Sequence, residues 1–188
     1  MGIFEFLNKD KKQDISLSIV KCAQLPQAEY LKTLIETCGY KKYLELGVYF
    51  GTTYNYVKKY CEVAHAVDIE FKDFINKDSF FHMTTDEFFK QNKNMYDLIF
   101  IDAAKSQSIK FFEKFKYFLK DNGTIITDNL KFHGNVGKSS EIESKNLRSL
   151  VGKIENYIEF LKNNPEFETK FYNVGDGLSV SVKKDEKK

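Results

Sequence analysis

Asp102 and Lys105 are the residues whose types and spacing most directly suggest chemistry. The stretch YDLIFIDAAKSQ, residues 96–107, places an apolar run before Asp102 and an amine three residues after it. Such a run is typical of a buried strand, and a carboxylate beside a lysine can hold a cation or handle a proton. The alternative for Lys105 is a solvated lysine at a helix start, where the helix dipole disfavours a positive charge. We therefore interpret Lys105 as a candidate base.

Three other predicted strands also end in polar groups. Glu45-x-Gly47 follows the first strand, Asp68 follows the second, and Asp128-Asn129 follows the fifth. In an open parallel sheet, ligands bind at the carboxyl ends of the strands. One acidic strand end means little because Asp often caps a following helix. Four polar ends on the same edge favour a binding site over caps and solvated loops.

The residues Asp102, Asp128 and Asn129 supply two carboxylates and one amide oxygen. An oxygen-only set of this kind suits Mg²⁺ or Mn²⁺, and Mg²⁺ keeps several waters beside a few protein ligands. A bound cation polarises a substrate oxygen and lowers its pKa. Lys105 could then take or stabilise the proton. The sequence thus predicts a divalent metal site without separating Mg²⁺ from Mn²⁺.

A glycine turn follows the first predicted strand in ELGVYFG, residues 45–51. Gly47 and Gly51 form G-x-x-x-G, and glycines let the backbone approach a ligand closely. Asp68 lies 23 residues after Glu45, about where an acidic residue hydrogen-bonds a ribose in nucleotide-binding sheets. The sequence has no G-x-G-x-x-G loop there, so the predicted nucleoside ligand need not carry phosphate.

Alternating strand and helix patterns must position these residues. The predicted strands cover residues 42–48, 63–69, 80–85, 96–103 and 124–129. The predicted helices cover residues 27–38, 52–61, 86–92 and 108–120, with Asp86 near the start of the third and DNG, residues 121–123, stopping the fourth. Such alternation predicts an α/β fold with a mostly parallel sheet and helices on both faces.

The C-terminal pattern differs from this alternation. A helix over residues 146–164 precedes strands at 167–174 and 178–184, which the turn Gly-Asp-Gly joins into an antiparallel pair at the sheet edge. No linker or repeat divides the chain, so we predict a single domain over residues 1–188. Residues 1–26 are then an N-terminal extension or helix, and residues 184–188 a solvated tail.

Composition restricts the class of protein. The chain has 188 residues, 42% hydrophobic and 30% charged, which is typical of a globular protein. No apolar run approaches the roughly 18 residues of a membrane span, and the N-terminus lacks a secretory signal. The isolated Cys22, Cys38 and Cys61 indicate reduced, buried thiols in a cytoplasmic protein.

Charge is unevenly distributed along the chain. Residues 1–104 carry 13 Lys and 15 Asp or Glu, a balance of −2, whereas residues 105–188 carry 16 Lys or Arg and 12 Asp or Glu, a balance of +4. This asymmetry permits an anionic partner. Lys145 and Arg148 are candidates for phosphate contacts. His133, in the loop after Asn129, is a weaker candidate for substrate contact.

Several motifs together resemble a known family. YLELGVYFGTT, AVDIE, YDLIFIDAAKSQ and GTIITDNLKFHGNV resemble the metal-dependent, catechol-type O-methyltransferases of the class I S-adenosylmethionine fold, over roughly residues 27–183. Residues 148–184 are similar to the C-terminal part of bacterial tRNA 5-hydroxyuridine methyltransferases, which methylate the 5-hydroxyl of the wobble uridine. The resemblance implies a Rossmann-like methyltransferase, S-adenosylmethionine as cofactor, and tRNA as substrate.

The resemblance also implies a role for each site residue. The cofactor set is Glu45, Gly47 and Tyr49 at the methionine end, Gly51 and Thr53 completing the loop, Asp68 at the ribose, Thr85 and Asp86 near the adenine, and Asp102. The catalytic and metal set is Lys105 as the base and Asp102, Asp128 and Asn129 as the metal ligands. A cation at the end of the strand would explain why Asp102 is followed by an amine.

Some positions depart from the family pattern. Ala104 stands where the family often has a second aspartate, and Gln107-Ser108 where it often has Asn-Tyr. Neither change removes a predicted metal ligand. The short segment between Asp68 and Asp86 predicts a turn in place of a full helix.

Other functions stay open at this stage. One is the same chemistry on a small catechol-like or other vicinal-oxygen acceptor. Another is a non-catalytic nucleoside- or RNA-binding module, although such a module would have no physical reason to keep a metal ligand set and a base. Aromatic-rich surface segments make a homodimer plausible, and we expect no membrane partner.

Overall fold

One mixed sheet organises the protein. The computed structural model describes residues 27–71 and 75–184 and arranges seven strands in the order β3-β2-β1-β4-β5-β7-β6. The five parallel strands are β1 (Lys42–Leu46), β2 (Val63–Asp68), β3 (Phe80–His82), β4 (Tyr96–Ile101) and β5 (Leu119–Thr127). The strands β6 (Phe167–Tyr172) and β7 (Leu178–Lys183) close one edge in antiparallel pairing. The predicted α/β class and the C-terminal antiparallel pair are confirmed.

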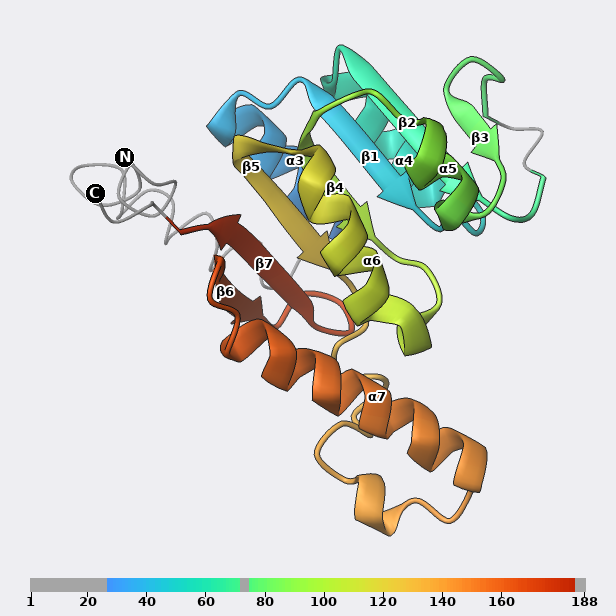
Figure 1. Ribbon diagram of the computed structural model, residues 1–188, viewed down its shortest axis with the longest axis vertical. Coiled ribbons are helices and arrows are strands. Elements are labelled where there is room, and N and C mark those ends of the chain that lie inside the picture. Colours follow the sequence, from blue (N-terminus) through green and yellow to red (C-terminus); the bar gives the residue numbers. More distant parts are fainter. Residues whose placement is uncertain (1–26, 72–74, 185–188) are drawn as a thin grey trace.

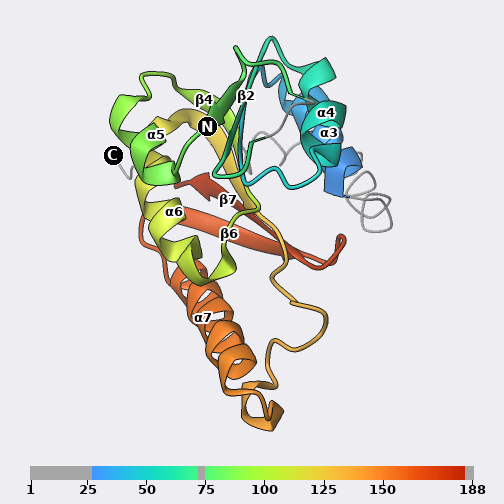
Figure 2. The same ribbon diagram turned by 90° about the vertical axis from the view of Figure 1, so that its right-hand side faces the viewer.

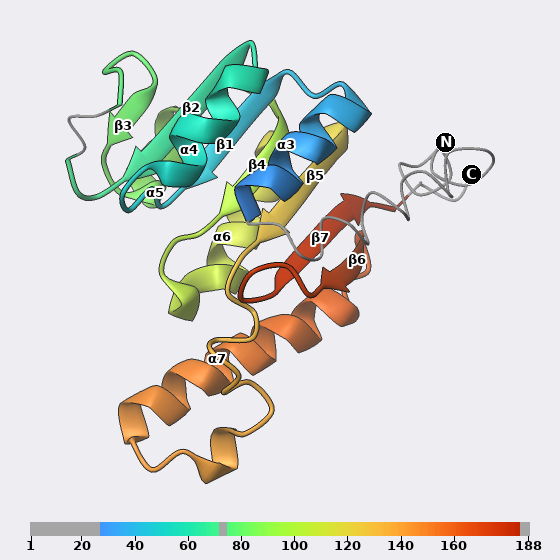
Figure 3. The ribbon, with the colours of Figure 1, turned by 180° about the vertical axis from the view of Figure 1, so that it is seen from behind.

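Helices cover both faces of the sheet. One face carries α3 (Gln27–Cys38) and α4 (Thr52–Val57), and the other carries α5 (Thr85–Gln91), α6 (Ser108–Phe115) and α7 (Lys145–Lys162). Figure 1 shows α5 and α6 in front of the sheet, and Figure 3 shows α3 and α4 from behind. The edge-on view of Figure 2 separates the two helical layers. No helix of the described ranges is long and apolar enough to span a membrane.

The strands β1, β2, β4 and β5 contribute buried residues to the cores on both faces of the sheet, which explains their apolar runs. Tyr43 in β1 joins the core under α3 and α4, whereas its neighbour Leu44 joins the core under α5, α6 and α7. Successive side chains of a strand point to opposite faces, so these four strands contribute to both cores. Packing on both faces holds these strands in place, and with them the polar residues at their carboxyl ends.

The fourth predicted helix is shorter than expected. It ends at Phe115, a 3₁₀ turn covers Lys116–Phe118, and β5 already begins at Leu119. The prediction that residues 121–123 stop the helix is therefore wrong, because these residues lie inside β5. Gly123 fits there because a β-carbon would lie 2.9 Å from the carbonyl oxygen of Asp97.

The start of α5 also differs from the prediction. The N-cap is Thr84, which forms a capping box with Glu87, and Asp86 instead pairs with lysines of α6. Between β2 and β3 the described residues form bends and a turn, as predicted, while residues 72–74 lie outside the described ranges.

The predicted N-terminal extension and C-terminal tail lie almost entirely outside the described residues. Residues 1–26 and 185–188 lie outside the described ranges. Lys184 is exposed but not free, because its backbone N–H donates to the carbonyl of Glu166 at 2.8 Å. Of the cysteines, Cys38 and Cys61 are free and only partly buried, and Cys22 lies outside the described ranges.

Candidate active site

The carboxyl ends of four parallel strands meet at one edge of the sheet. The backbone N–H of Asp102 donates to the carbonyl of Leu46 at 2.9 Å, and that of Asp128 to the carbonyl of Ile101 at 3.2 Å. These bonds extend the β1–β4 and β4–β5 ladders by one residue and place Asp102 next to Asp128. We call the part of the sheet formed by the carboxyl ends of β1, β2, β4 and β5 the acidic rim.

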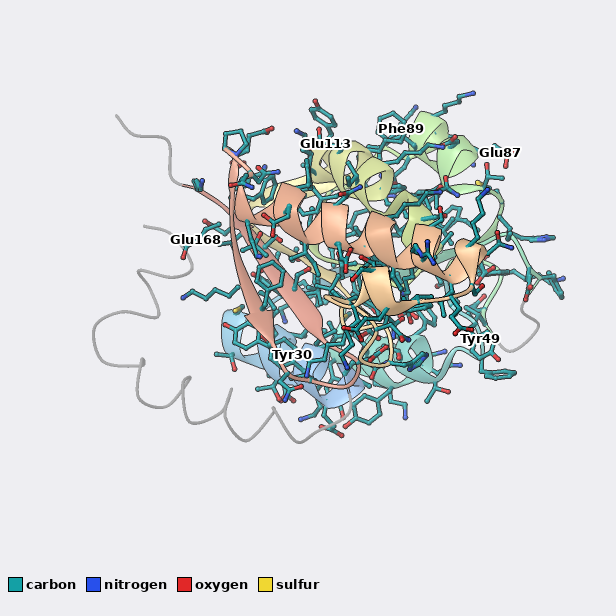
Figure 4. All side chains as sticks on the ribbon, turned by 90° about the horizontal axis from the view of Figure 1, so that it is seen from below. Tyr30, Tyr49, Glu87, Phe89, Glu113 and Glu168 are labelled. Atoms are coloured by element: carbon teal, nitrogen blue, oxygen red, sulfur yellow. The ribbon has the colours of Figure 1, made fainter. Side chains whose placement is uncertain are left out.

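The glycine turn after β1 packs directly on the end of β4. Gly47 has φ +81°, and a β-carbon there would lie 2.6 Å from the carbonyl oxygen of Asp102. Only glycine fits such a contact. Gly51 has φ +68° and forms the N-cap of α4. The non-glycine Tyr49 has φ +46°, and its side chain is 70% exposed at the periphery of the molecule (Figure 4).

Asp68 holds this turn in place. One carboxylate oxygen accepts the N–H groups of Val48 at 2.8 Å and Tyr49 at 3.3 Å, and the other accepts the N–H of Glu70 at 2.9 Å. The sequence pattern predicted a contact with a ribose and missed this contact with the backbone. A carboxylate has about four lone-pair sites, so the two functions are compatible.

A pocket of about 530 Å³ opens beside the turn and the end of β2. We call it the rim pocket. Of the predicted cofactor residues, Gly47, Tyr49, Asp68, Thr85, Asp86 and Asp102 line it. The predicted residues Glu45, Gly51 and Thr53 are not among its lining residues. Gly51 acts through the helix cap, and Thr53 lies in the first turn of α4.

Glu45 lies beneath the rim rather than on it. Its side chain is 1% exposed, and the hydroxyl of Tyr43 donates to it at 2.5 Å. Burial raises the pKa of Glu45 well above its usual range, although the bond from Tyr43 opposes this, and the charges of Asp102 and Asp68 raise it further. A carboxyl group under these conditions is easily protonated.

Lys105 and Asp102 form an ion pair. The Lys105 Nζ lies 2.6 Å from Asp102 Oδ1, and the two side chains are 16% and 28% exposed. Lys105 begins a 3₁₀ turn, Lys105–Gln107, that leads into α6. The alternative of a freely solvated lysine is therefore wrong, although the role of base stays a prediction.

Asp128 is the most deeply buried member of the predicted metal set. It is 1% exposed and accepts the N–H of Asn129 at 2.6 Å. Burial, followed by the charge of Asp102, raises the pKa of Asp128 to about 6. A divalent cation would relieve the repulsion between these carboxylates. The oxygen donors present therefore fit a hard cation.

Among the described residues, no group of three or more His, Cys, Asp or Glu side chains is placed to hold a metal ion. The predicted set differs from such a group because one of its three members is Asn129. Its binding of a metal stays a prediction.

Asp86 reaches the rim pocket from the start of α5. Lys110 and Lys114 of α6 bind its two carboxylate oxygens at 2.8 and 2.6 Å. The hydrogen bonds from these lysines lower the pKa of Asp86 to about 2. This pair of contacts ties α5 to α6 beside the rim pocket, which Asp86 and Lys110 line.

Comparison with known proteins identifies the family. The O-methyltransferase family model matches residues 52–184. A Staphylococcus aureus crystal structure, described as a candidate caffeoyl-CoA O-methyltransferase, is 32% identical, with a TM-score of 0.75 over 84% of this chain and 83% of that one. The chain belongs to the O-methyltransferase family.

Two further proteins similar to this chain differ in the share of each sequence that the match covers. The tapetum-specific methyltransferase 1 of Arabidopsis thaliana is 28% identical over 96 residues, which are 50% of this chain and 41% of that protein. The chain thus spans less than half the length of that curated relative. An O-methyltransferase of Bacillus cereus, solved with S-adenosylhomocysteine, shares the fold at 20% identity and a TM-score of 0.67, over 95% of this chain and 93% of that one.

The sequence missed several residues that line the rim pocket of this O-methyltransferase. They are Val48, Val67, Ile69, Glu70, Met83, Thr84, Ala103, Lys110 and Phe111. Ala104 and Gln107, which the sequence showed as departures from the family pattern, also line the pocket. Thr84 could have been found, because T-x-x-E before an apolar run is a capping-box signature. Lys110 and Phe111 carry no local signal, since only the packing of α6 brings them to the pocket.

Proposed function

We propose that this protein transfers a methyl group from S-adenosylmethionine to a hydroxyl group held beside a divalent cation. The Lys105–Asp102 ion pair carries the proposal, because Asp102 also lines the rim pocket. The glycine turn and Asp68 supply the features of a nucleoside site. The S-adenosylhomocysteine bound to the Bacillus cereus relative supports the choice of cofactor.

Asp102, Asp128 and Asn129 would hold the cation, which would be Mg²⁺ or Mn²⁺. When bound, the cation would supply Lewis acidity that lowers the pKa of the acceptor hydroxyl. In its ion pair with Asp102, Lys105 is an ammonium without a lone pair, so it would first have to release its proton. The neutral amine would then accept the hydroxyl proton, the oxygen would take the methyl group, and S-adenosylhomocysteine would leave. The Gly47 turn and Asp68 would hold the donor, with Thr85 and Asp86 near its adenine.

For the acceptor we propose 5-hydroxyuridine at the tRNA wobble position. Its enol-like hydroxyl stands beside a carbonyl, so it offers two adjacent oxygens as a catechol does. The resemblance of residues 148–184 to tRNA 5-hydroxyuridine methyltransferases and the +4 balance of residues 105–188 support an RNA partner. Anticodon-loop bases can leave the stack to enter a pocket.

Of the two candidates for phosphate contacts, Arg148 already has a structural function. Its Nε and Nη2 atoms donate to the carbonyl of Ile142 at 2.8 and 2.6 Å and close the loop before α7. Lys145, at the exposed start of α7, is therefore the better candidate for an RNA contact.

A small catechol-like acceptor is the alternative. It is supported by the Staphylococcus aureus relative, whose description names caffeoyl-CoA. A small acceptor would make activity nearly independent of salt, whereas RNA binding through lysines on phosphates weakens steeply as salt rises.

The test is to incubate the protein, S-adenosylmethionine and Mg²⁺ with tRNA that carries 5-hydroxyuridine, and to measure 5-methoxyuridine by mass spectrometry. Parallel reactions contain a small catechol, excess chelator, or chelator followed by Mn²⁺. We expect 5-methoxyuridine, its loss with chelator, and its recovery with metal. Methylation of the catechol alone would favour the alternative, full activity in chelator would reject the metal, and no product with either acceptor would indicate a binding module.

A further inference from the structure

The turn between β6 and β7 is bound to the segment that follows Asn129. The backbone N–H of Leu130 donates to the carbonyl of Gly177 at 3.0 Å, and that of Lys131 to the carbonyl of Asp176 at 2.8 Å. The N–H of His133 donates to both carboxylate oxygens of Asp176, at 2.9 Å each. The Gly-Asp-Gly sequence was predicted only to connect two strands. We call this set of contacts the turn clasp.

The clasped segment has an unusual backbone. Asn129, Phe132 and His133 have φ values of +64°, +44° and +56°. For residues other than glycine, the left-handed region costs about 1–2 kcal/mol per residue. Such conformations persist only where the surrounding contacts enforce them, and they concentrate at functional sites. The turn clasp supplies these contacts on the C-terminal side of Asn129.

The turn itself is well anchored. Val174 is fully buried. Gly177 has φ +90° and packs against Lys131 so closely that a β-carbon at Gly177 would lie 2.9 Å from Lys131 Cγ. On the other side, Gly175 packs against the side chain of Gln27 at the start of α3. Near it, the rings of Tyr30 and Tyr172 lie 5.7 Å apart; Tyr30 is labelled in Figure 4. The turn can therefore act as a fixed support for the rim.

We propose that Asp176 is a positioning residue that holds residues 129–133 in a backbone conformation that is left-handed at Asn129, Phe132 and His133, and that it thereby places Asn129 beside Asp102 and Asp128. The proposal rests on the proposed function, since the metal-binding role of Asn129 belongs to it. Asp176 acts through the backbone N–H of His133 and needs no contact with acceptor or cofactor. Its exposed fraction, 20%, is consistent with a support behind the site.

Two substitutions separate the hydrogen bonds of Asp176 from its charge. Asp176→Asn removes the charge but keeps a carbonyl oxygen that can accept the N–H of His133. Asp176→Ala removes both. Mn²⁺ affinity is measured from the electron paramagnetic resonance signal of free Mn²⁺, and KM and kcat from methylation of 5-hydroxyuridine tRNA. Hydrogen exchange of the amides of residues 129–134 reports on the segment directly.

We expect Asp176→Ala to weaken Mn²⁺ binding about 10-fold or more, as is typical when an outer hydrogen-bond partner of a metal site is lost. The KM for the acceptor should rise, the affinity for S-adenosylhomocysteine should stay the same, and amide exchange in residues 129–134 should accelerate. Asp176→Asn should restore Mn²⁺ affinity to near the wild-type value.

Asp97→Ala is the matched control. The Asp97 carboxylate also accepts two backbone N–H groups, from Lys41 and Lys42 at 3.0 and 2.8 Å, but it lies near the start of β4, at the opposite end of that strand from Asp102. Its loss should lower the free energy of unfolding without changing Mn²⁺ affinity or the acceptor KM.

Three results would overturn the proposal. Equal loss of Mn²⁺ affinity in Asp176→Asn and Asp176→Ala would mean that charge, not the hydrogen bonds, is responsible. Unchanged Mn²⁺ affinity and KM in Asp176→Ala, with faster amide exchange, would leave the clasp a purely structural contact. Absence of Mn²⁺ binding in the wild-type protein would reject the proposed metal site and the positioning role with it, whatever the exchange rates show.

Discussion

At the scale of single residues, the rim carboxylates differ in what they contact. Asp68 accepts three backbone N–H groups, Asp102 pairs with Lys105, and Asp128 is buried with one N–H donor from Asn129. Identical side chains therefore have different chemical environments. Substitutions at these positions should produce different defects, which kinetics and binding can separate.

Asp68→Ala should weaken S-adenosylhomocysteine binding, because a hydrogen bond to a charged group contributes roughly 1.5–3 kcal/mol and the turn at Val48 and Tyr49 also loses its support. We therefore expect at least a 10-fold rise in Kd by calorimetry. Asp78→Ala is the control, since Asp78 is an exposed carboxylate in the turn before β3. Unchanged affinity in Asp68→Ala would reject the ribose assignment.

Lys105→Met should lower kcat by about 10²–10⁴-fold, the usual contribution of general acid–base catalysis, while S-adenosylhomocysteine still binds. Methionine keeps much of the side-chain volume and loses the amine. The control is Lys162→Met, which removes an exposed lysine paired with Glu159 at the end of α7. A near-normal kcat in Lys105→Met would show that the ion pair is structural.

At the scale of elements, short connections determine the shape of the rim pocket. The helix α5 has only seven residues, and both its cap Thr84 and its first residue Thr85 line the pocket. Isolated short helices are unstable in water, so the cap and the packing of the buried Phe88 against Phe115 of α6 hold α5 in place. Capping and cofactor binding are thus coupled at this helix.

Thr84→Ala should lower the free energy of unfolding by about 1 kcal/mol, the typical effect of losing an N-cap. Asp86→Ala should change it less than Thr84→Ala does, because exposed ion pairs contribute little. Urea denaturation of both variants provides the comparison. If Asp86→Ala proved the more destabilising substitution, Asp86 would contribute more than Thr84 to the stability of the first turn of α5.

At the scale of the whole molecule, the fold concentrates negative charge at one end of the sheet. The charges of Asp102 and Asp68 raise the pKa of the buried Glu45, and that of Asp102 also raises the pKa of Asp128. Such repulsion destabilises the ligand-free protein and would be relieved by a cation. Stability and ligand binding are therefore opposed at the rim.

Glu45→Gln should make the ligand-free protein more stable at pH 8 than the wild type. The pKa of Glu45 is raised in the folded state, whereas in the unfolded chain it is about 4.3. At any pH between these two pKa values, the native protein keeps a proton that the unfolded chain has released. The free energy of unfolding therefore falls as pH rises through this window.

The neutral glutamine lacks this dependence on pH, so the difference between the two proteins should shrink toward pH 4. Urea denaturation at pH 4, 6 and 8 provides the measurement. Parallel pH profiles for the two proteins would mean that Glu45 does not titrate as its burial suggests.

The sequence by itself determined the positions of the strands, the alternation of strands and helices, and the polar residues at the strand ends. Leu98–Ile101 followed by Asp102 predicts a buried strand and its exit, because hydrophobic periodicity and turn chemistry are local properties of the chain. The parallel arrangement follows from the alternation, so the side-by-side placement of Asp102 and Asp128 was also predictable.

Only the tertiary structure decided which distant groups meet these residues. Lys110 reaches Asp86 across 24 positions, and Asp176 reaches the N–H of His133 across 43. Helix packing and the return of the C-terminal hairpin create such contacts, and they leave no periodic signal in the sequence. The early end of α6 likewise results from β5 pairing with β4, where sheet formation outweighs the local helical preference of residues 116–120.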